Sequence, residues 1–308
     1  MKRNTVVIGT RGSDLARTQT GMVADMVARI AGVPVDIIII KTEGDRIQDV
    51  PLHMVEGKGF FTKELEEALL EGRIDLAVHS LKDLPTESPK GLTIAAIPPR
   101  EKANDLLLVR DGVVNEASPR LLPPNAGVGT SSKRRALQIM AMQPGAAVRE
   151  LRGNVPTRIA KLVSGQYDAI LLAAAGYRRL SIEPEGYRVV VLPFEDMLPA
   201  PGQGALALQT RADDAELLEL LKTLHDAATA DEVDAERRAL ELLGGGCGMP
   251  LGIHAQRQGA ELHVRAILGP DDWQLHDAPS YVRAEAAGGT PEEAAQRVIH
   301  ALTTAPKG

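Results

Sequence analysis

The feature that most constrains the fold of this 308-residue chain is an alternation of short β-rich runs with helical patterns over its first two thirds. Residues 5–9, 34–41, 75–80 and 91–97 have the composition of strands, whereas residues 63–72 have the apolar spacing of a helix and end on glycine. Strands that alternate with helices form a mostly parallel sheet with helices on both faces. The alternation therefore predicts an α/β fold.

The same alternation restarts after the proline pair at residues 98–99, so we expect a second α/β unit. A cluster rich in proline and glycine at residues 198–205 closes that unit. Its predicted strands cover residues 104–110, 126–130, 146–151 and 167–173, and its predicted helices cover residues 132–142, 155–164 and 174–180. Two joined α/β units favour a cleft between lobes in which ligands bind at strand ends.

The last third of the chain has a different pattern. Helices are predicted at residues 217–224, 231–243 and 291–302, with a glycine-rich turn at residues 244–252 and strands between that turn and the last helix. We interpret this part as a small C-terminal α+β domain. A chain of 308 residues has room for two or three domains, at roughly 100 to 200 residues each.

Charge is unevenly distributed along the chain, although the net charge is only −6. Residues 130–161 carry seven bases against one acid (7 − 1 = +6), and residues 212–241 carry three bases against ten acids (3 − 10 = −7). We expect the acidic stretch to be a solvated helical face. The basic stretch favours a bound anion, because Arg134 and Arg135 open a predicted helix, where cations oppose the helix dipole.

Composition excludes several classes of protein. Only 3% of the residues are aromatic and the net charge is negative, which argues against a nucleic-acid-binding surface. The single cysteine, Cys247, permits no intrachain disulfide and fits a reducing compartment. The first residues do not match a signal peptide, and no apolar run approaches the roughly 18 residues of a membrane span. We expect a cytoplasmic protein that binds neither membrane nor nucleic acid.

Two predicted strand-to-helix junctions have the composition of anion sites. Residues 129–132 (Gly-Thr-Ser-Ser) place backbone N–H groups and hydroxyls at the start of the helix that carries Arg134 and Arg135. Arg11 and Ser13 repeat this design after the first strand. The simpler interpretation is that the serines only cap helices. Two such junctions at matching positions favour binding.

Charged side chains also follow two other predicted strands. Lys82 and Asp83 lie just beyond a strand end, either as a surface ion pair or as a cleft carboxylate that stabilises a cation or exchanges protons. Arg152 follows another strand, and Arg158 lies in the first turns of the next helix. The planar guanidinium of arginine favours bidentate binding of carboxylates.

The lone cysteine lies within the sequence Gly-Gly-Gly-Cys-Gly. Cys247 is either a small buried apolar residue or an accessible nucleophile that serves as a covalent attachment point. The histidines at positions 53, 79, 225 and 254 lack the spacing of metal ligands, so no metal site is predicted.

Taken together, these segments resemble the porphobilinogen deaminase (hydroxymethylbilane synthase) family. Nine motifs occur in that family's order between residues 5 and 253, namely GTRGS, KTEGD, GKGFFTKELE, DLAVHSLKDLP, GTSSKRRALQ, LRGNVPTR, YDAILLAAAG, LPAPGQGAL and GGCGMPLG. The resemblance implies a transferase of haem biosynthesis. Such an enzyme polymerises four porphobilinogen molecules head to tail on a covalently bound dipyrromethane, releasing ammonia and then the linear tetrapyrrole hydroxymethylbilane.

The resemblance also implies a domain plan, with two lobes like those of periplasmic binding proteins and a small C-terminal α+β domain. The first lobe would comprise residues 1–100 and 203–222, the second lobe residues 103–198, and the C-terminal domain residues 226–308. It further implies a monomer whose partner is the small molecule porphobilinogen.

Roles carry over by resemblance at matching positions. Asp83 matches the catalytic aspartate, and Cys247 matches the cysteine that binds the dipyrromethane cofactor through a thioether. Matches to cofactor-binding residues are Lys82, Thr130, Ser132, Arg134 and Arg135. Matches to residues that receive substrate and growing chain are Arg11, Ser13, Arg152, Arg158 and Arg179. Lys58 and Phe61 match a region near the cofactor, and residues 43–60 resemble a mobile lid.

Elementary chemistry agrees with these roles. Each porphobilinogen brings an acetate and a propionate, so the growing chain accumulates negative charge that the basic residues 130–161 can bind. Asp83 would stabilise the cation left when ammonia departs, and the thiolate of Cys247 would capture the same electrophile. Gly248 and Gln209 depart from the family pattern, which commonly has a larger polar residue and an acid there.

Three alternatives stay open at the level of the sequence. They are a two-lobed anion-binding or sensor protein without catalysis, a cysteine hydrolase, and a protein that binds phosphate ligands through its Ser-Arg junctions. Asp83 and Cys247 discriminate among them, because a protein that only binds anions requires neither.

Overall fold

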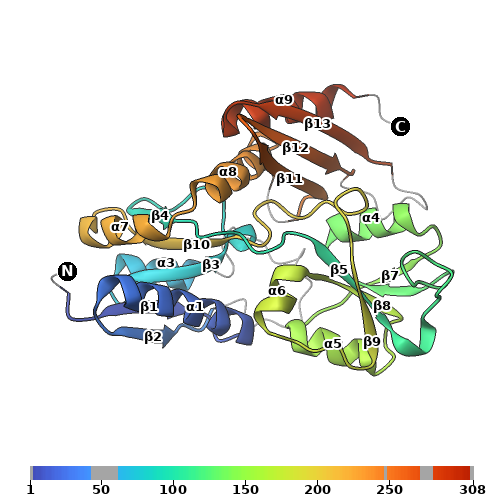
Figure 1. Cartoon of the computed structure of the whole chain (residues 1–308), viewed down its shortest axis with the longest axis horizontal. Coiled ribbons are helices and arrows are strands. Elements are labelled where there is room, and N and C mark those ends of the chain that lie inside the picture. The colour runs from blue at the N-terminus through green and yellow to red at the C-terminus, as the bar shows by residue number, and fades with distance from the viewer. Residues whose placement is uncertain (1–2, 43–61, 246–247, 271–279, 306–308) are drawn as a thin grey trace. The chain divides into compact units, whose positions relative to one another are not determined.

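The computed structural model describes residues 3–42, 62–245, 248–270 and 280–305 (Figure 1). These residues form two compact units. Unit 1 consists of Met1–Glu101 and Gly204–Ala230, and unit 2 consists of Lys102–Gln203 and Asp231–Gly308. The chain therefore leaves unit 1, returns to it, and leaves it again.

The sheet of unit 1 has the strand order β2-β1-β3-β10-β4. Its strands are β1 (Val6–Thr10), β2 (Val35–Ile39), β3 (Leu76–Ser80), β4 (Leu92–Ala96) and β10 (Leu206–Arg211). β1 pairs in parallel with β2 and β3, whereas β10 pairs antiparallel with β3 and β4. The sheet is therefore mostly parallel, and the strand that runs against the others is the one that follows the return from unit 2.

Helices cover both faces of this sheet, because successive residues of a strand point to opposite faces. On one face Ile8 of β1 is buried in a core shared with α1 (Asp14–Ala31) and α7 (Ala215–Leu221). On the other face α3 (Lys63–Leu70) packs with Ala77 of β3.

The sheet of unit 2 has the strand order β7-β6-β8-β5-β9. Its strands are β5 (Asp105–Arg110), β6 (Gly127–Gly129), β7 (Ala147–Arg149), β8 (Ala169–Ala173) and β9 (Tyr187–Val191). β6 pairs in parallel with β7 and β8, and β5 pairs antiparallel with β8 and β9. The two sheets thus share one topology, in which β6 corresponds to β1 and β5 corresponds to β10.

This second sheet is also covered on both faces. Leu107 of β5 belongs to the core that includes α4 (Lys133–Met142). Leu108, which points the opposite way, belongs to the core that includes α5 (Val155–Val163) and α6 (Ala174–Arg179).

The C-terminal part of unit 2 is an antiparallel sheet with the order β11-β12-β13. Its elements are α8 (Ala227–Leu242), β11 (Leu251–Gln258), β12 (Glu261–Leu268), β13 (Val282–Gly288) and α9 (Pro291–Thr304). Ala239 of α8 and Val298 of α9 share a buried core with Ile253 of β11. Short 3-10 helices elsewhere are η2 (Leu81–Asp83), η3 (Asp111–Val113) and η4 (Lys222–Leu224).

The predicted fold class is confirmed, because two mostly parallel α/β sheets and a small antiparallel α+β part are present. β9 and β10 were not predicted as strands from the sequence. β10 directly follows the cluster of proline and glycine that was interpreted as the end of a unit. It becomes a strand by pairing with β3 and β4, which lie far away in the sequence.

The prediction that residues 212–241 form a solvated face is wrong for two of their acids. Glu236 is fully buried, and its carboxylate accepts hydrogen bonds from the N–H groups of Gly202 at 2.7 Å and Ala255 at 2.9 Å. Asp214 is buried where its side chain caps α7. These carboxylates satisfy backbone donors that would otherwise be buried without partners.

Candidate active site

In unit 1, two of the segments selected from the sequence lie at the same edge of the sheet. Arg11 and Ser13 follow β1, and Lys82 and Asp83 follow β3. β1 and β3 are parallel neighbours, so their carboxyl ends share one edge. Ligands of open α/β sheets bind outside these carboxyl ends.

Asp83 ends the short helix η2, and the turn that carries it is anchored in the core. Leu81 and Leu84 are buried, and the N–H of Leu81 donates to the carbonyl of Ala205 at 3.0 Å. The N–H of Leu84 donates to the carbonyl of Leu81 at 3.2 Å. The turn therefore holds the exposed Asp83 side chain just outside the end of β3.

Ser13 caps α1, as the sequence predicted. Its Oγ accepts a hydrogen bond from the N–H of Ala16 at 3.3 Å. A hydroxyl that accepts a hydrogen bond still has its own O–H to donate. Capping and substrate binding by Ser13 are therefore compatible.

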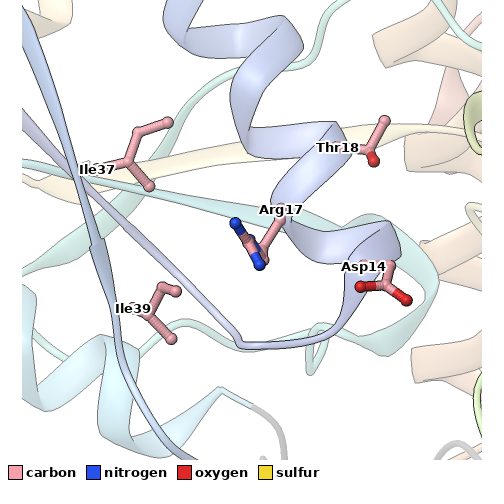
Figure 2. A pocket seen from close by; sticks show the side chains of 5 residues that line it. All are labelled: Asp14, Arg17, Thr18, Ile37 and Ile39. Carbon is pink, nitrogen blue, oxygen red and sulfur yellow. The ribbon is translucent and has the colours of Figure 1, made fainter.

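A groove of about 510 Å³ adjoins this junction (Figure 2). Its walls are Asp14, Arg17 and Thr18 from the first turns of α1, and Ile37 and Ile39 from β2. Figure 2 shows the guanidinium of Arg17 between the helix and the strand that carries the two isoleucines. This edge of unit 1 thus offers apolar surface next to a cation.

Three buried polar side chains, from β3, β10 and α3, are linked by hydrogen bonds: His79, Gln209 and Glu66. Gln209 Nε2 donates to Glu66 Oε1 at 3.2 Å, so its Oε1, which lies 3.0 Å from His79 Nε2, accepts from the imidazole. Burial lowers the pKa of His79 to about 4. The charge of Arg11 also lowers this pKa, whereas the hydrogen bond with Gln209 raises it. Burial also raises the pKa of Glu66. His79 is therefore neutral at pH 7, with its proton on Nε2.

In unit 2, the predicted junction of strand, hydroxyls and helix lies between β6 and α4. Ser132 is the N-cap of α4, and its Oγ accepts from the N–H of Arg135 at 3.4 Å. Thr130 Oγ1 accepts from the N–H of Ser132 at 3.1 Å. The hydroxyls are thus gathered at a helix N-terminus, where the dipole favours anions.

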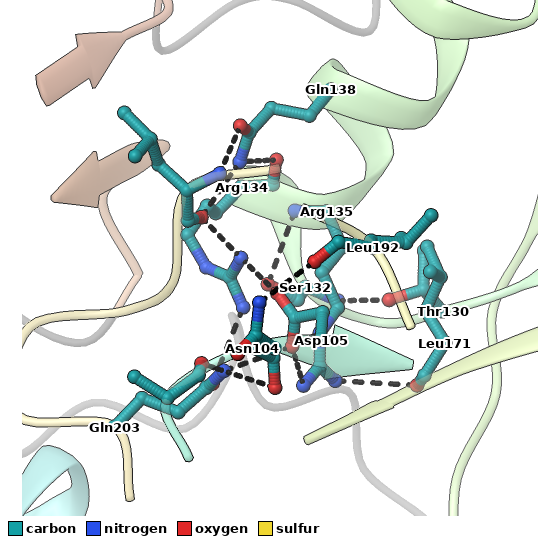
Figure 3. Close-up of polar contacts among 12 residues, drawn as sticks. Asn104, Asp105, Thr130, Ser132, Arg134, Arg135, Gln138, Leu171, Leu192 and Gln203 are labelled. Carbon is teal, nitrogen blue, oxygen red and sulfur yellow. Dashed lines mark hydrogen bonds and ion pairs between the residues drawn. The ribbon is translucent and has the colours of Figure 1, made fainter. Parts of the chain in front are cut away.

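The guanidinium groups of Arg134 and Arg135 meet a single buried carboxylate, that of Asp105 (Figure 3). Asp105 is fully buried, and its oxygens lie 2.5 Å from Arg134 Nη1 and 2.7 Å from Arg135 Nη2. Gln203 Nε2 donates to the same carboxylate at 3.0 Å. Figure 3 shows these side chains converging from the start of β5, from α4 and from the segment before β10.

Burial opposes ionisation of Asp105, but the charges of Arg134 and Arg135 outweigh it and hold the pKa of this carboxyl well below its ordinary value. Burial lowers the pKa of Arg134, and the charge of Asp105 opposes that effect. One carboxylate faces two guanidinium groups (+2 − 1 = +1), so the cluster keeps one net positive charge.

This arrangement corrects one step of the sequence argument. Arg134 and Arg135 at the start of α4 favour a bound anion by their sequence position, yet the protein's own Asp105 supplies most of the compensation. Asp105 and Gln203 were not among the residues predicted from the sequence. An acid at the head of the apolar run of β5, Asp-Leu-Leu-Leu-Val, was the available signal, because a carboxylate is rarely buried without a partner.

Three further arginines of unit 2 lie on segments that follow its parallel strands. Arg152 follows β7, and its Nε donates to Glu150 Oε1 at 2.8 Å. Arg158 lies in α5, and its Nε donates to the carbonyl of Gly153 at 2.7 Å. Arg179 ends α6, which begins directly after β8. β7 and β8 flank β6, so these segments and the start of α4 leave the same edge of the sheet.

Some predicted residues lie outside the described ranges, namely Cys247, Lys58, Phe61 and residues 43–60 as a segment. Within the described ranges, no group of three or more His, Cys, Asp or Glu side chains is arranged to hold a metal ion. No helix in this part of the chain is long and apolar enough to cross a membrane.

Comparisons with known proteins point to one family. Residues 6–219 match the model described as "Porphobilinogen deaminase, dipyromethane cofactor binding domain", and residues 230–302 match "Porphobilinogen deaminase, C-terminal domain". A porphobilinogen deaminase of Oceanobacillus iheyensis is 46% identical over 269 residues, which are 87% of this chain and 85% of the relative. That of Brevibacillus brevis is 47% identical over 271 residues, 87% of this chain and 86% of the relative.

Among solved structures, the periplasmic VFT2 domain of Bordetella pertussis BvgS is similar at a TM-score of 0.43 and 15% identity, over 76% of this chain and 92% of that one. No conclusion depends on a similarity of this size.

Proposed function

The chain belongs to the porphobilinogen deaminase family, and on this premise we propose that Asp83 is its catalytic carboxylate and that Cys247 carries its cofactor. The protein is a deaminating transferase of tetrapyrrole biosynthesis. It joins four porphobilinogen molecules head to tail, with loss of ammonia, and releases hydroxymethylbilane. A non-catalytic anion-binding or sensor protein is not favoured, because the relatives along most of the chain are enzymes by name.

The proposed role of Asp83 is to stabilise the positive charge that develops during the reaction. Loss of ammonia from porphobilinogen leaves positive charge on the pyrrole, and a nearby carboxylate stabilises that charge and exchanges protons with the reacting groups. The exposed position of Asp83, on a turn anchored by the buried Leu81 and Leu84, supports this role.

Cofactor binding is assigned to Lys82, Thr130, Ser132, Arg134 and Arg135. The donor chemistry of this set fits a carboxylate-bearing molecule, because the Asp105 cluster keeps one net positive charge at the N-terminus of α4. When bound, the dipyrromethane cofactor supplies the pyrrole to which the first porphobilinogen is added. The residues named above hold its carboxylates and orient it.

The attachment point is Cys247, the only cysteine of the chain. A thiolate is a soft nucleophile and suits a thioether to a pyrrole methylene carbon. Lys58 and Phe61 are assigned to the surroundings of the cofactor.

We assign the binding of the substrate and of the growing chain to Arg11, Ser13, Arg152, Arg158 and Arg179. Each addition brings two more carboxylates, and arginine binds a carboxylate through two parallel hydrogen bonds. The assignment is supported because each of these residues lies on a segment that follows the carboxyl end of a parallel strand.

The observation that carries the catalytic proposal is the exposed Asp83 at a strand end in a chain that matches the family model over residues 6–219. Asp83→Ala should fold, as judged by circular dichroism, and lose about 10²- to 10⁴-fold in the rate of ammonia release from porphobilinogen. Asp213→Ala, at another exposed acid of unit 1, is the matched control. Turnover by Asp83→Ala at the rate of the control would remove Asp83 from the mechanism.

The attachment proposal has its own test. Intact-protein mass spectrometry should find the wild-type chain heavier than its sequence by a dipyrromethane, and an acidic aldehyde reagent should stain it. Cys247→Ser should have the mass of its sequence alone. An unmodified wild-type chain with full activity would refute the attachment.

We further propose the three-domain division of residues 1–100 with 203–222, 103–198, and 226–308, although residues 102–203 and 231–308 together form one compact unit of the structure. The protein is proposed to act as a cytoplasmic monomer that binds no nucleic acid. The cytoplasmic location is proposed because the thiol of Cys247 must stay free to form the thioether, which a reducing compartment allows.

A further inference from the structure

We propose that Ser131, Tyr167 and Lys161 are positioning residues that hold the backbone of residues 150–153 and thereby present Arg152 to a substrate carboxylate. The inference rests on the proposed function, which places Arg152 among the substrate-binding residues.

The observation is a run of four consecutive carbonyls, each of which accepts a hydrogen bond from a side chain. The pairs are Tyr167 Oη to the carbonyl of Glu150, Ser131 Oγ to that of Leu151 at 2.8 Å, Lys161 Nζ to that of Arg152 at 3.1 Å, and Arg158 Nε to that of Gly153 at 2.7 Å. Carbonyls near the protein surface can bond to water instead, and of residues 150–153 only Leu151 is buried. Four side-chain donors in succession therefore indicate a segment whose conformation is specified.

Ser131 makes one of these four bonds and a second bond to the same residue. Its Oγ donates to the carbonyl of Leu151 and also accepts from the N–H of Leu151 at 3.1 Å. Ser132, not Ser131, caps α4. Ser131 therefore ties the cofactor-binding junction after β6 to the substrate-binding segment after β7.

Tyr167 reaches this segment because Gly129 has no side chain. A Cβ at position 129 would lie 2.8 Å from Cδ1 of the Tyr167 ring, which is too close for van der Waals contact. Gly153 takes a left-handed conformation with φ of 110°, which favours glycine. The conformation of residues 150–153 thus explains why glycine occupies position 129 of the motif GTSSKRRALQ and position 153 of the motif LRGNVPTR.

The far side of the segment is fixed by α5. Asn154 caps this helix, with its Oδ1 accepting from the N–H of Thr157 at 2.9 Å. Arg158 and Lys161 are three residues apart, so they extend from the same face of α5 back to the segment. The backbone on both sides of Arg152 is therefore held by regular elements.

Such a scaffold reduces the freedom that substrate binding must remove. An arginine on a mobile turn loses backbone and side-chain entropy when it binds a carboxylate, whereas one on a fixed turn loses side-chain freedom only. The Nε of Arg152 already donates to Glu150 Oε1, which limits the orientations of the guanidinium.

The test uses Ser131→Ala and Tyr167→Phe, each of which removes only a hydroxyl. We expect KM for porphobilinogen to rise about 3- to 10-fold in each, the effect of one hydrogen bond, with kcat changed less than about twofold. Ser118→Ala and Tyr281→Phe are matched controls in unit 2 and should behave as wild type. Hydrogen exchange of the amides of residues 150–154 should be faster in the two test variants than in the controls.

A double-mutant cycle separates positioning from general stability. In an Arg152→Ala background, Ser131→Ala should raise KM by less than about twofold, because its effect passes through Arg152. If Arg152→Ala itself leaves KM unchanged, the proposed substrate role of Arg152 fails. If Arg152→Ala raises KM but the hydroxyl deletions do not, or raise it equally in both backgrounds, the positioning role is wrong and the proposed function stands.

Discussion

Replacing Asp105 with asparagine should destabilise unit 2 far more than the same change at an exposed ion pair. The Asp105 carboxylate is fully buried and serves both Arg134 and Arg135, at 2.5 Å and 2.7 Å. Asparagine keeps the size of the side chain but removes its charge. Two buried guanidinium groups would then face each other without a countercharge.

The magnitude follows from this geometry. Removing one partner of a buried ion pair costs about 3–5 kcal/mol, because the remaining charge is left desolvated. At about 2–4 °C per kcal/mol for a unit of this size, the melting temperature of unit 2 should fall by about 6–20 °C. In the wild type this stabilisation is present above pH 3.8, the ordinary pKa of Asp, and is lost as the pH falls toward the lower pKa of folded Asp105.

The assay is thermal and urea unfolding at pH 7, followed by circular dichroism. Asp111→Asn is the matched control, because the Asp111 and Arg188 side chains are 51% and 61% exposed and lie 3.4 Å apart. That exposed pair should contribute about 0–1 kcal/mol. Adding Arg135→Met to Asp105→Asn should restore part of the stability, since it removes one of the two uncompensated charges.

Two results would refute this reasoning. Equal losses of stability in Asp105→Asn and Asp111→Asn would show that the buried guanidinium groups need no countercharge. A double variant less stable than Asp105→Asn alone would show that Arg135 contributes by packing and not through its charge.

Three further predictions concern other buried groups. The free energy of unfolding should fall as the pH drops from about 6.5 to about 4, because unfolded His79 binds a proton that the buried imidazole does not, and His79→Asn should flatten this dependence in urea titrations. Gly129→Ala should cost about 1–3 kcal/mol in thermal unfolding by displacing the Tyr167 ring, whereas Gly21→Ala, in the open middle of α1, should stabilise by about 0.5–1 kcal/mol. Glu236→Gln should cost about 1.5–3 kcal/mol in urea unfolding, because each carboxylate oxygen accepts from one backbone N–H and the amide keeps only one of these two acceptors.

Much of the local structure could be predicted from the sequence. The apolar periodicity predicted most strands and helices of both α/β units, although not β9 and β10. Ser13 and Ser132 cap helices, which for Ser132 was one of the two interpretations of its junction. These features depend on hydrogen bonds between residues close in the chain, so a short window of sequence contains the necessary information. The ordered motifs also identified the family before any geometry was known.

Strand pairings and ion pairs between residues far apart in the chain could not be predicted from local sequence patterns. β10 inserts between β3 and β4 only after the chain has passed through unit 2, and no local pattern records that return. Likewise, the sequence indicated that Arg134 and Arg135 bind an external anion, whereas Asp105 of β5 forms ion pairs with both.

By itself, then, the sequence determined the fold class and the family and supplied the residues that we propose for the chemistry, because periodicity, capping and motif order are local properties. Only the tertiary structure decided which buried groups neutralise one another and how the segment that bears Arg152 is held. The physical reason is that burial and Coulombic pairing depend on distance in space, which separation along the chain does not specify.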